Sequence, residues 1–247
     1  VVDNKSGAGG VIGSAEVAKA APDGHTILMG NIGPQSIAYS LYRNMPYKPE
    51  SLVGVSNVIT APNVLVVHPS VPAKTVPEFV AWLKAQNGKA SYASSGTGQS
   101  PHLSAAWFLQ LTGTKAEHIP YRGAGPALQD LIAGQVDLMF DGLGSSATHI
   151  KSGRIKALAV AGSKRAVGFP DVPTIAEAGV PGYEVSTWYG LWAPKGTPKE
   201  AITAMQAELR KAFASDEIRN IWHGLGADTP NLYGDAFGQF VSGEVKR

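Results

Sequence analysis

The stretch between residues 94 and 100 carries the strongest chemical signal in the chain. It reads Ser94-Ser95-Gly96-Thr97-Gly98-Gln99-Ser100, and Pro101 follows it. Glycine lets a backbone approach a ligand closely, and the serine and threonine hydroxyls can donate hydrogen bonds. We expect Ser100 to cap a helix that begins at Pro101, whose free N–H groups and dipole favour an anion. The alternative is a plain strand-to-helix turn with a serine cap.

A second glycine-rich stretch, Gly7-Ala8-Gly9-Gly10-Val11-Ile12-Gly13, lies near the start of the chain. It does not match the dinucleotide pattern Gly-x-Gly-x-x-Gly, which would require glycine in place of Ile12. The chain also lacks the Gly-Lys-Ser/Thr sequence of nucleoside triphosphate sites. The loop formed by Ala8, Gly9 and Gly10 is therefore either an anion-binding helix start or a structural turn.

Asp141 ends an apolar segment, Val136–Phe140, and Gly142 follows it. At the end of a strand in a parallel sheet, a carboxylate faces the crevice in which ligands bind. Asp141 would there orient a water or a donor group of the ligand. The alternative role is an Asx-turn or a helix cap.

Other polar side chains carry weaker signals. Arg122 either pairs with a ligand carboxylate or lies on the surface beside a glycine turn. His68 and His102 have no partners at metal-ligand spacing, so we expect structural roles for both. Ser100 is not part of a Gly-x-Ser-x-Gly nucleophile elbow, and we expect no catalytic residue, no metal and no cofactor.

The elements that must position these loops alternate between strand and helix. Strand patterns occur at 26–29, 90–94, 118–121, 136–140 and 154–160, and helical patterns follow most of them. In the helix after Pro101 we expect Leu103, Ala106, Trp107 and Leu111 to form the buried face. Strand, glycine loop and helix in repetition predict an α/β fold with mostly parallel sheets flanked by helices.

Two apolar segments, 63–68 and 188–194, differ from the rest because Pro-containing sequence and then a helical stretch follow each. We interpret them as strands that link two lobes. Lobe I then comprises residues 1–68 and 188–247, and lobe II comprises residues 69–187. The segment Lys199–Ala214 is predicted to be an amphipathic helix of lobe I.

Composition narrows the functional classes. The chain has 247 residues, of which 44% are hydrophobic and 16% charged, with a formal net charge of +2. This composition predicts a packed core and gives no basic surface for nucleic acid. The absence of cysteine excludes thiol nucleophiles, disulfides and cysteine-bound metals. No apolar run approaches the ~20 residues that span a bilayer, so we expect no membrane insertion.

Several motifs taken together resemble the Bug family, the substrate-binding receptors of tripartite tricarboxylate transporters. The similarity runs in order from Asn4 to about Pro198. The motifs that carry it are Asn4–Gly13, Pro22–Leu28, Tyr92–Gly98, Pro120–Leu131, Gly134–Asp141, Asp171–Gly179 and Ala193–Pro198. None of them is specific alone, but their combination is.

The resemblance implies a two-lobed periplasmic-binding-protein-like (type 2) fold that closes on a carboxylate by hinge motion. It implies a monomeric periplasmic receptor whose partners are membrane components of a tripartite transporter. Its ligand would be a di- or tricarboxylate, an acidic amino acid or an aromatic acid. The expected ligand residues are Ala8, Gly9, Gly10, Ser94, Ser95, Gly96, Thr97, Gly98, Ser100 and Asp141.

Family members carry a signal peptide, a strand, a glycine-rich loop and a helix ahead of the segment seen here. The opening residues Val1-Val2-Asp3-Asn4 fit the end of a strand already under way, so we expect such a segment before them.

Two other classes of protein are alternatives to a receptor. An α/β hydrolase or transferase acting on a small carboxylate would need a nucleophile with a base, a metal cluster or a cofactor loop. None occurs at convincing spacing. A regulatory ligand-sensing module would come with a basic DNA-binding segment, which the chain also lacks.

Overall fold

The computed structural model describes residues 1–227 and 231–246. They form two compact units, and β2 (Leu52–Val67) and β7 (Ser186–Pro194) each have residues in both. Unit 1 holds residues 1–60, 188–222 and the C-terminal segment, and unit 2 holds residues 61–187 and 223–227. Residues 61–68, which the sequence-based division places in lobe I, thus belong to unit 2. The reason is packing, because the side chains of Val64–Val67 are fully buried in the cores of unit 2.

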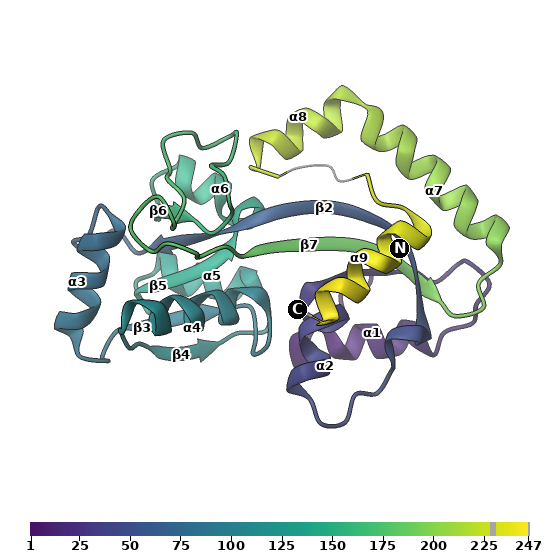
Figure 1. Ribbon diagram of the computed structural model, residues 1–247, viewed down its shortest axis with the longest axis horizontal. Coiled ribbons are helices and arrows are strands. Elements are labelled where there is room, and N and C mark those ends of the chain that lie inside the picture. Colours follow the sequence, from purple (N-terminus) through teal and green to yellow (C-terminus); the bar gives the residue numbers. More distant parts are fainter. Residues whose placement is uncertain (228–230, 247) are drawn as a thin grey trace. The chain divides into compact units, whose positions relative to one another are not determined.

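Unit 1 combines short elements from the start of the chain with helices from its end (Figure 1). Its strand β1 pairs antiparallel with β7, from Leu28 opposite Trp192 to Asn31 opposite Tyr189. The opening residues 1–6 form neither helix nor strand, in contrast to the prediction for Val1-Val2. Besides parts of β2 and β7, the unit contains η1 (Ala8–Gly10), α1 (Val11–Ala18), β1 (Leu28–Asn31), η2 (Gly33–Ile37), α2 (Ala38–Leu41), η3 (Pro49–Ser51), α7 (Lys199–Ala214), most of α8 (Asp216–Gly224) and α9 (Gly234–Lys246).

The core of unit 1 is aromatic. Trp188 and Trp192 of β7 pack with Phe237 of α9, and their ring centroids lie 5.0–6.3 Å apart. Gly190 lies between the two tryptophans, and a Cβ atom there would collide with the Phe237 ring and lie 2.9 Å from the carbonyl oxygen of Ser56. Glycine at this position therefore lets the α9 aromatic ring lie directly on β7.

Unit 2 is a three-layer α/β/α arrangement around a mixed sheet. Strand β3 pairs parallel with both β4 and β5, whereas β2 pairs antiparallel with β5 and β6. Besides part of β2, its elements are α3 (Val76–Gln86), β3 (Ser91–Ser94), α4 (Ser100–Thr112), β4 (Glu117–Pro120), α5 (Ala124–Ile132), β5 (Leu138–Gly142), α6 (Leu143–Lys151) and β6 (Lys156–Val160).

The α/β class is confirmed, but the sheets are mixed, and the prediction of mostly parallel strands is wrong in part. The direction of β2 explains why. Its run Val64–Val67 is apolar at every position because side chains of both faces are buried, and such a run carries no information on strand direction.

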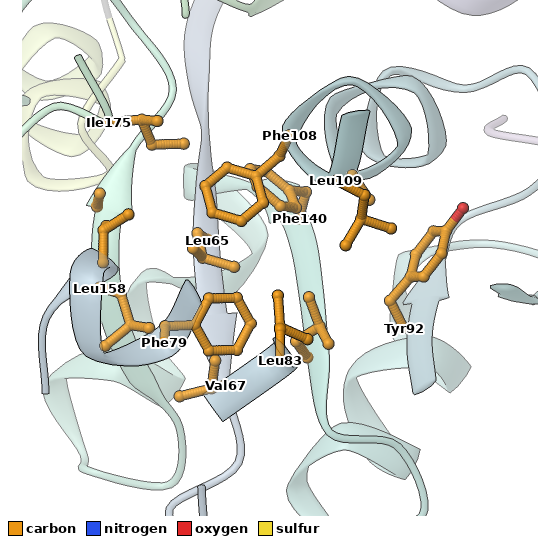
Figure 2. Packing of buried hydrophobic residues seen from close by; sticks show 14 of the residues in the cluster. Leu65, Val67, Phe79, Leu83, Tyr92, Phe108, Leu109, Phe140, Leu158 and Ile175 are labelled. Atoms are coloured by element: carbon orange, nitrogen blue, oxygen red, sulfur yellow. The ribbon is translucent and has the colours of Figure 1, made fainter. Parts of the chain in front are cut away.

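Side chains that alternate along the unit 2 strands pack into two separate hydrophobic cores. Leu65 and Val67 of β2 belong to one core, and Val64 and Val66 belong to the other. Helices α3 and α4 cover the first core, where Phe79, Phe108 and Phe140 meet Leu65 (Figure 2). Helices α5 and α6 cover the second. Successive side chains of a strand point to opposite faces of the sheet, so helices on both faces give each strand two buried sides.

Helix α4 buries a different face from the predicted one. Its fully buried side chains include Ser104, Ala105 and Phe108, whereas Leu111 is 47% exposed. A polar residue can occupy the core here because Asn63 Nδ2 donates to Ser104 Oγ at 2.8 Å, and Tyr183 Oη donates to the Ser104 carbonyl at 2.8 Å. Hydrogen bonding thus makes Ser104 part of the core, which hydrophobic periodicity alone does not reveal.

Candidate functional site

The loop of residues 94–100 lies where β3 ends and α4 begins, in unit 2. The turn is sharp because Gly96 and Gly98 adopt φ values of 135° and 82°. Residues that have a Cβ atom rarely adopt such values. Within the loop, the Gln99 N–H donates to the Gly96 carbonyl at 3.2 Å. At the end of β3, the Tyr121 N–H donates to the Ser94 carbonyl at 3.0 Å. The loop is therefore tied down at both ends of its turn.

Two backbone N–H groups of this loop are used internally. The Gly96 N–H donates to Ser94 Oγ at 3.2 Å, and the Gly98 N–H donates to His102 Nδ1 at 3.2 Å. These two N–H groups hold the loop in shape and are not available to a ligand in this conformation. That Ser94, Gly96 and Gly98 contact a ligand stays a prediction. Their hydrogen bonds favour a role in holding the shape of the loop.

Three hydroxyls of the same loop remain as donors. Among the described residues, no hydrogen-bond partner lies near the side chains of Ser95, Thr97 or Ser100. Thr97 is exposed, Ser95 is half-buried and Ser100 is 5% exposed. Neutral donors at the start of a helix suit an anion that carries several acceptor oxygens.

The cap of α4 differs from the predicted one. Gln99 is the N-cap residue, with φ −79° and ψ 159°, so Ser100 is already the first residue of the helix. No side chain caps this end, and Pro101 in the first turn has no N–H to satisfy. At the other end Gly113, with φ 61°, closes α4 in the left-handed conformation.

A pair of stacked histidines lies beneath the loop. The rings of His102 on α4 and His118 on β4 stack with centroids 4.2 Å apart, and Tyr92 of β3 stacks on His118 at 4.8 Å. His118 Nε2 lies 2.7 Å from Ser94 Oγ. Burial, and then the neighbouring His102, lower the pKa of His118 to about 4, and burial lowers the pKa of His102. Both rings are therefore neutral near pH 7.

His118 had no signal as a functional residue in the sequence, and His102 only a structural one. The parallel pairing of β3 with β4 places His118 opposite Tyr92, next to the loop 94–100. The one sequence feature that could have indicated it is its place in a short strand pattern, 118–121, that comes soon after the strand pattern ahead of the loop.

Asp141 lies near the end of β5, which runs parallel to β3, so both strands end at the same edge of the sheet. Its side chain is 2% exposed and accepts a hydrogen bond from Ser146 Oγ of α6 at 2.7 Å. Burial raises the pKa of Asp141 to about 7, against the opposing effects of the Ser146 hydroxyl and the Gly142 N–H. The carboxyl group is thus fixed to the first turns of α6 and takes up a proton near neutral pH.

A further polar pair lies at this edge. Asn63 of β2 stands opposite Gly142 of β5, and its Nδ2 bonds to Ser104 as described above. Among the described residues Asn63 Oδ1 has no hydrogen-bond partner, although the side chain is fully buried. Such an acceptor usually pairs with an ordered water or with a donor group of a ligand.

The loop of Ala8–Gly10 belongs to unit 1. Gly7, Ala8, Gly9 and Gly10 all have positive φ, at 125°, 45°, 58° and 84°. Gly10 donates its N–H to the Gly7 carbonyl at 2.9 Å and is the N-cap residue of α1. Successive backbone N–H groups in such conformations form concavities that bind anions. The geometry is compatible with both readings of the sequence, an anion-binding start of a helix and a structural turn.

The remaining candidates are placed as follows. Arg122 is exposed at the start of the loop before α5, as the surface alternative predicts. His68 Nδ1 contacts Ser70 Oγ at 2.7 Å, near the start of β5 rather than its end. In residues 1–227 and 231–246 no three His, Asp or Glu side chains cluster as a metal site. No helix in that part of the chain is long and apolar enough to cross a membrane.

Sequence comparison gives the same family as the motifs. All of residues 1–247 match the model of the tripartite tricarboxylate transporter family receptor. A UPF0065 protein from the tcbD-tcbE intergenic region of Pseudomonas sp. strain P51 is 40% identical over 243 residues, which is 96% of this chain and 72% of the relative. The protein BugT of Bordetella pertussis is 36% identical over all of this chain and 76% of its own length.

Solved structures agree. The R. palustris protein Rpa4515 with adipate has a TM-score of 0.97 and 34% identity, over 100% of this chain and 83% of that one. MatC from Rhodopseudomonas palustris with bound malate has a TM-score of 0.91 and 33% identity, over 98% and 83% of the two chains. The periplasmic binding protein BugD has a TM-score of 0.95 and 36% identity, with coverage of 100% and 83%. The chain therefore belongs to the tripartite tricarboxylate transporter family of receptors, the Bug proteins, which are periplasmic solute-binding proteins and not enzymes.

Proposed function

We propose that this receptor captures a small dicarboxylate in the periplasm, takes it up with a hinge motion of two lobes, and delivers it as a monomer to the membrane components of a tripartite transporter. The single observation that carries the choice of ligand is the set of hydroxyls on Ser95, Thr97 and Ser100 at the start of α4, which have no hydrogen-bond partner in the described part of the chain. The adipate and malate in two related structures support a dicarboxylate.

The chemistry of this loop favours a carboxylate over a larger or more highly charged anion. No lysine or arginine occurs between residues 90 and 114, so the anion would be held by neutral donors and the helix dipole. A carboxylate presents a few acceptor sites in one plane, which a few hydroxyl and N–H groups can satisfy. Hydrogen bonds to a charged group contribute about 1.5–3 kcal/mol each.

The other proposed ligand contacts come from different parts of the chain. Asp141, with its pKa near 7, can donate a hydrogen bond to a second carboxylate when it is protonated. Alternatively, in its ionised form it accepts one from a hydroxyl of a hydroxy acid. The backbone of Ala8–Gly10 supplies N–H groups in unit 1. Tricarboxylates, acidic amino acids and aromatic acids are the remaining ligand classes to be tested.

The test begins with the ligand itself. Small molecules released from the denatured protein are identified by mass spectrometry, and calorimetry then measures adipate, malate, citrate, glutamate and benzoate. Adipamide is the matched control for adipate, because it has the same length and no charge. We expect a carboxylate to bind at least about tenfold more tightly than its amide, since each charge-assisted bond is worth that much. Equal affinity for adipate and adipamide would exclude the anion site.

A further inference from the structure

The turn of the loop 94–100 depends on two side-chain acceptors, one in the loop and one on α4. The Gly98 N–H donates to His102 Nδ1, and the Gly96 N–H donates to Ser94 Oγ, which in turn contacts His118 Nε2. Each of the two turning glycines is thus connected to one ring of the stacked histidine pair, His102 directly and His118 through Ser94.

The hydrogen-bond partners point to one tautomer for each ring. A backbone N–H can only donate, so His102 Nδ1 is an acceptor and the ring carries its proton on Nε2. The Ser94 hydroxyl is fully buried and already accepts from Gly96, so its own proton needs an acceptor. Among the described residues His118 Nε2 is the partner that can take it, which places the proton of His118 on Nδ1.

The surroundings keep both rings neutral. His118 faces Tyr92 from β3 and His102 from α4, and neither brings a negative charge. On its own strand Glu117 is exposed, and the nearest acid of α5, Asp130, is bonded to Tyr121 at 2.6 Å. Among the described residues neither histidine forms an ion pair. A proton on either ring would remove an acceptor and place a charge against the other ring.

We propose that His102 and His118 are positioning residues of the carboxylate-binding loop, which as a neutral stacked pair accept the protons of Gly98 and Ser94 and thereby leave Ser95, Thr97 and Ser100 free for the ligand. This inference rests on the proposed function of the loop. The inference predicts that ligand binding requires a hydrogen-bond acceptor at positions 102 and 118. It does not require a titratable group or an aromatic ring there.

The first test needs no ligand. Long-range proton–nitrogen NMR spectra of the histidine side chains report which ring nitrogen carries the proton. We expect the Nε2–H tautomer for His102 and the Nδ1–H tautomer for His118 between pH 6.5 and 8. The opposite tautomer at His102, or a charged ring at pH 7, would overturn the inference whatever the protein binds.

The second test uses variants that separate the acceptor from the ring. In His102→Asn and His118→Gln the amide oxygen replaces the accepting nitrogen, whereas His102→Leu and His118→Leu have no acceptor. With adipate as the probe, we expect the amide variants to bind within about threefold of wild type and the leucine variants to bind at least about tenfold more weakly.

His68 provides the matched control, because its Nδ1 accepts a backbone N–H from Ser70 at 3.2 Å in the same way. It lies near the start of β5, whereas the ligand loop lies at the edge where β5 ends. His68→Leu and His68→Asn should therefore change the melting temperature without changing adipate affinity. A loss of affinity in His68→Leu equal to that in His102→Leu would show a general structural effect and overturn the positioning role.

The outcomes distinguish this inference from the proposed function. If wild type and His102→Leu bind adipate equally well, the loop still binds a carboxylate but the histidines do not position it. If wild type binds adipate and adipamide equally, the anion site fails, and the tautomers alone then decide whether the pair holds the loop.

Discussion

The two glycine-rich loops of this protein are constructed differently. The loop 94–100 in unit 2 is held by side chains, Ser94 and His102, and carries hydroxyls that have no partner among the described residues. The loop Gly7–Gly10 in unit 1 contains no hydroxyl and turns through successive positive φ values, one of them at Ala8. Glycine content therefore sets how a loop can turn, but the neighbouring polar side chains decide which chemistry it offers.

The largest effect is expected from a methyl group at Gly96. Its φ of 135° lies outside the left-handed helical region, so Gly96→Ala strains the backbone by about 1–3 kcal/mol or forces the turn to change. We expect adipate binding to weaken at least about tenfold and the melting temperature to fall.

Gly9→Ala is the matched control in the other loop, because Gly9 has φ 58° and ψ 35°, where alanine costs about 1 kcal/mol. Calorimetry and thermal unfolding are measured on both variants. A larger loss of adipate affinity in Gly9→Ala than in Gly96→Ala would contradict this expectation. Ligand binding would then depend more on the backbone conformation of the unit 1 loop than on that of the loop 94–100.

The next effect concerns Asp141, and it is a dependence of stability on pH. The pKa of this buried carboxyl is raised from 3.8 to about 7, so its neutral form is favoured in the folded state. Its contribution to stability is fully present below about pH 4 and is lost as the pH rises through 7. Asp141→Asn cannot ionise, and its amide oxygen can still accept from Ser146.

We expect Asp141→Asn to be more stable than wild type by about 1–3 kcal/mol at pH 8 and similar to wild type at pH 4. Denaturant unfolding at both pH values measures the difference. Ser146→Ala is the companion variant, because it removes a hydrogen bond that favours the charged form of Asp141. This variant should lose more stability than wild type as the pH rises. A constant difference between Asp141→Asn and wild type from pH 4 to 8 would contradict the raised pKa.

A smaller effect is expected from the hydroxyl of Thr97. Thr97→Val keeps the shape of the side chain and removes one donor, so binding should weaken by about 1–2 kcal/mol, the scale of one hydrogen bond to a charged group. Because Thr97 is exposed, the melting temperature without ligand should barely move. Thr97→Ser retains the hydroxyl and should bind as wild type does. Unchanged binding together with a sharply lower melting temperature in Thr97→Val would assign this loop a structural role.

The sequence predicts features that depend on neighbouring residues better than features that depend on contacts between distant parts of the chain. A local pattern was reliable for α7, which spans Lys199–Ala214 as predicted. The prediction of strand direction was wrong in part, because the buried run of β2 is equally apolar in either orientation. The face of α4 was predicted wrongly because Asn63 and Tyr183 make the polar Ser104 a core residue.

The same limit applies to the candidate site. The loop 94–100 could be found from its composition, since glycines and hydroxyls lie together in the sequence. Its supports could not, because His118 and Ser146 reach Ser94 and Asp141 only through strand pairing and a helix turn. Residues that support a site have no local sequence pattern, because their role depends on contacts made by the fold.

The smallest effect sharpens the description of the unit 1 loop. Ala8 and Asn87 are the residues other than glycine with positive φ in the described part of the chain, at 45° and 50°. In this region a Cβ approaches the following carbonyl oxygen and costs about 1–2 kcal/mol, although asparagine tolerates it better than alanine does. Ala8→Gly removes that strain but adds conformational freedom to the unfolded chain, which opposes the gain by about 0.5–1 kcal/mol. The net result should be a stabilisation of about 0.5 kcal/mol, whereas Asn87→Gly at the end of α3 should gain nothing. Denaturant unfolding of both variants measures the difference. A destabilised Ala8→Gly would mean that the loop is not held in this conformation in solution, and the backbone of Ala8–Gly10 would then be no preformed anion cradle.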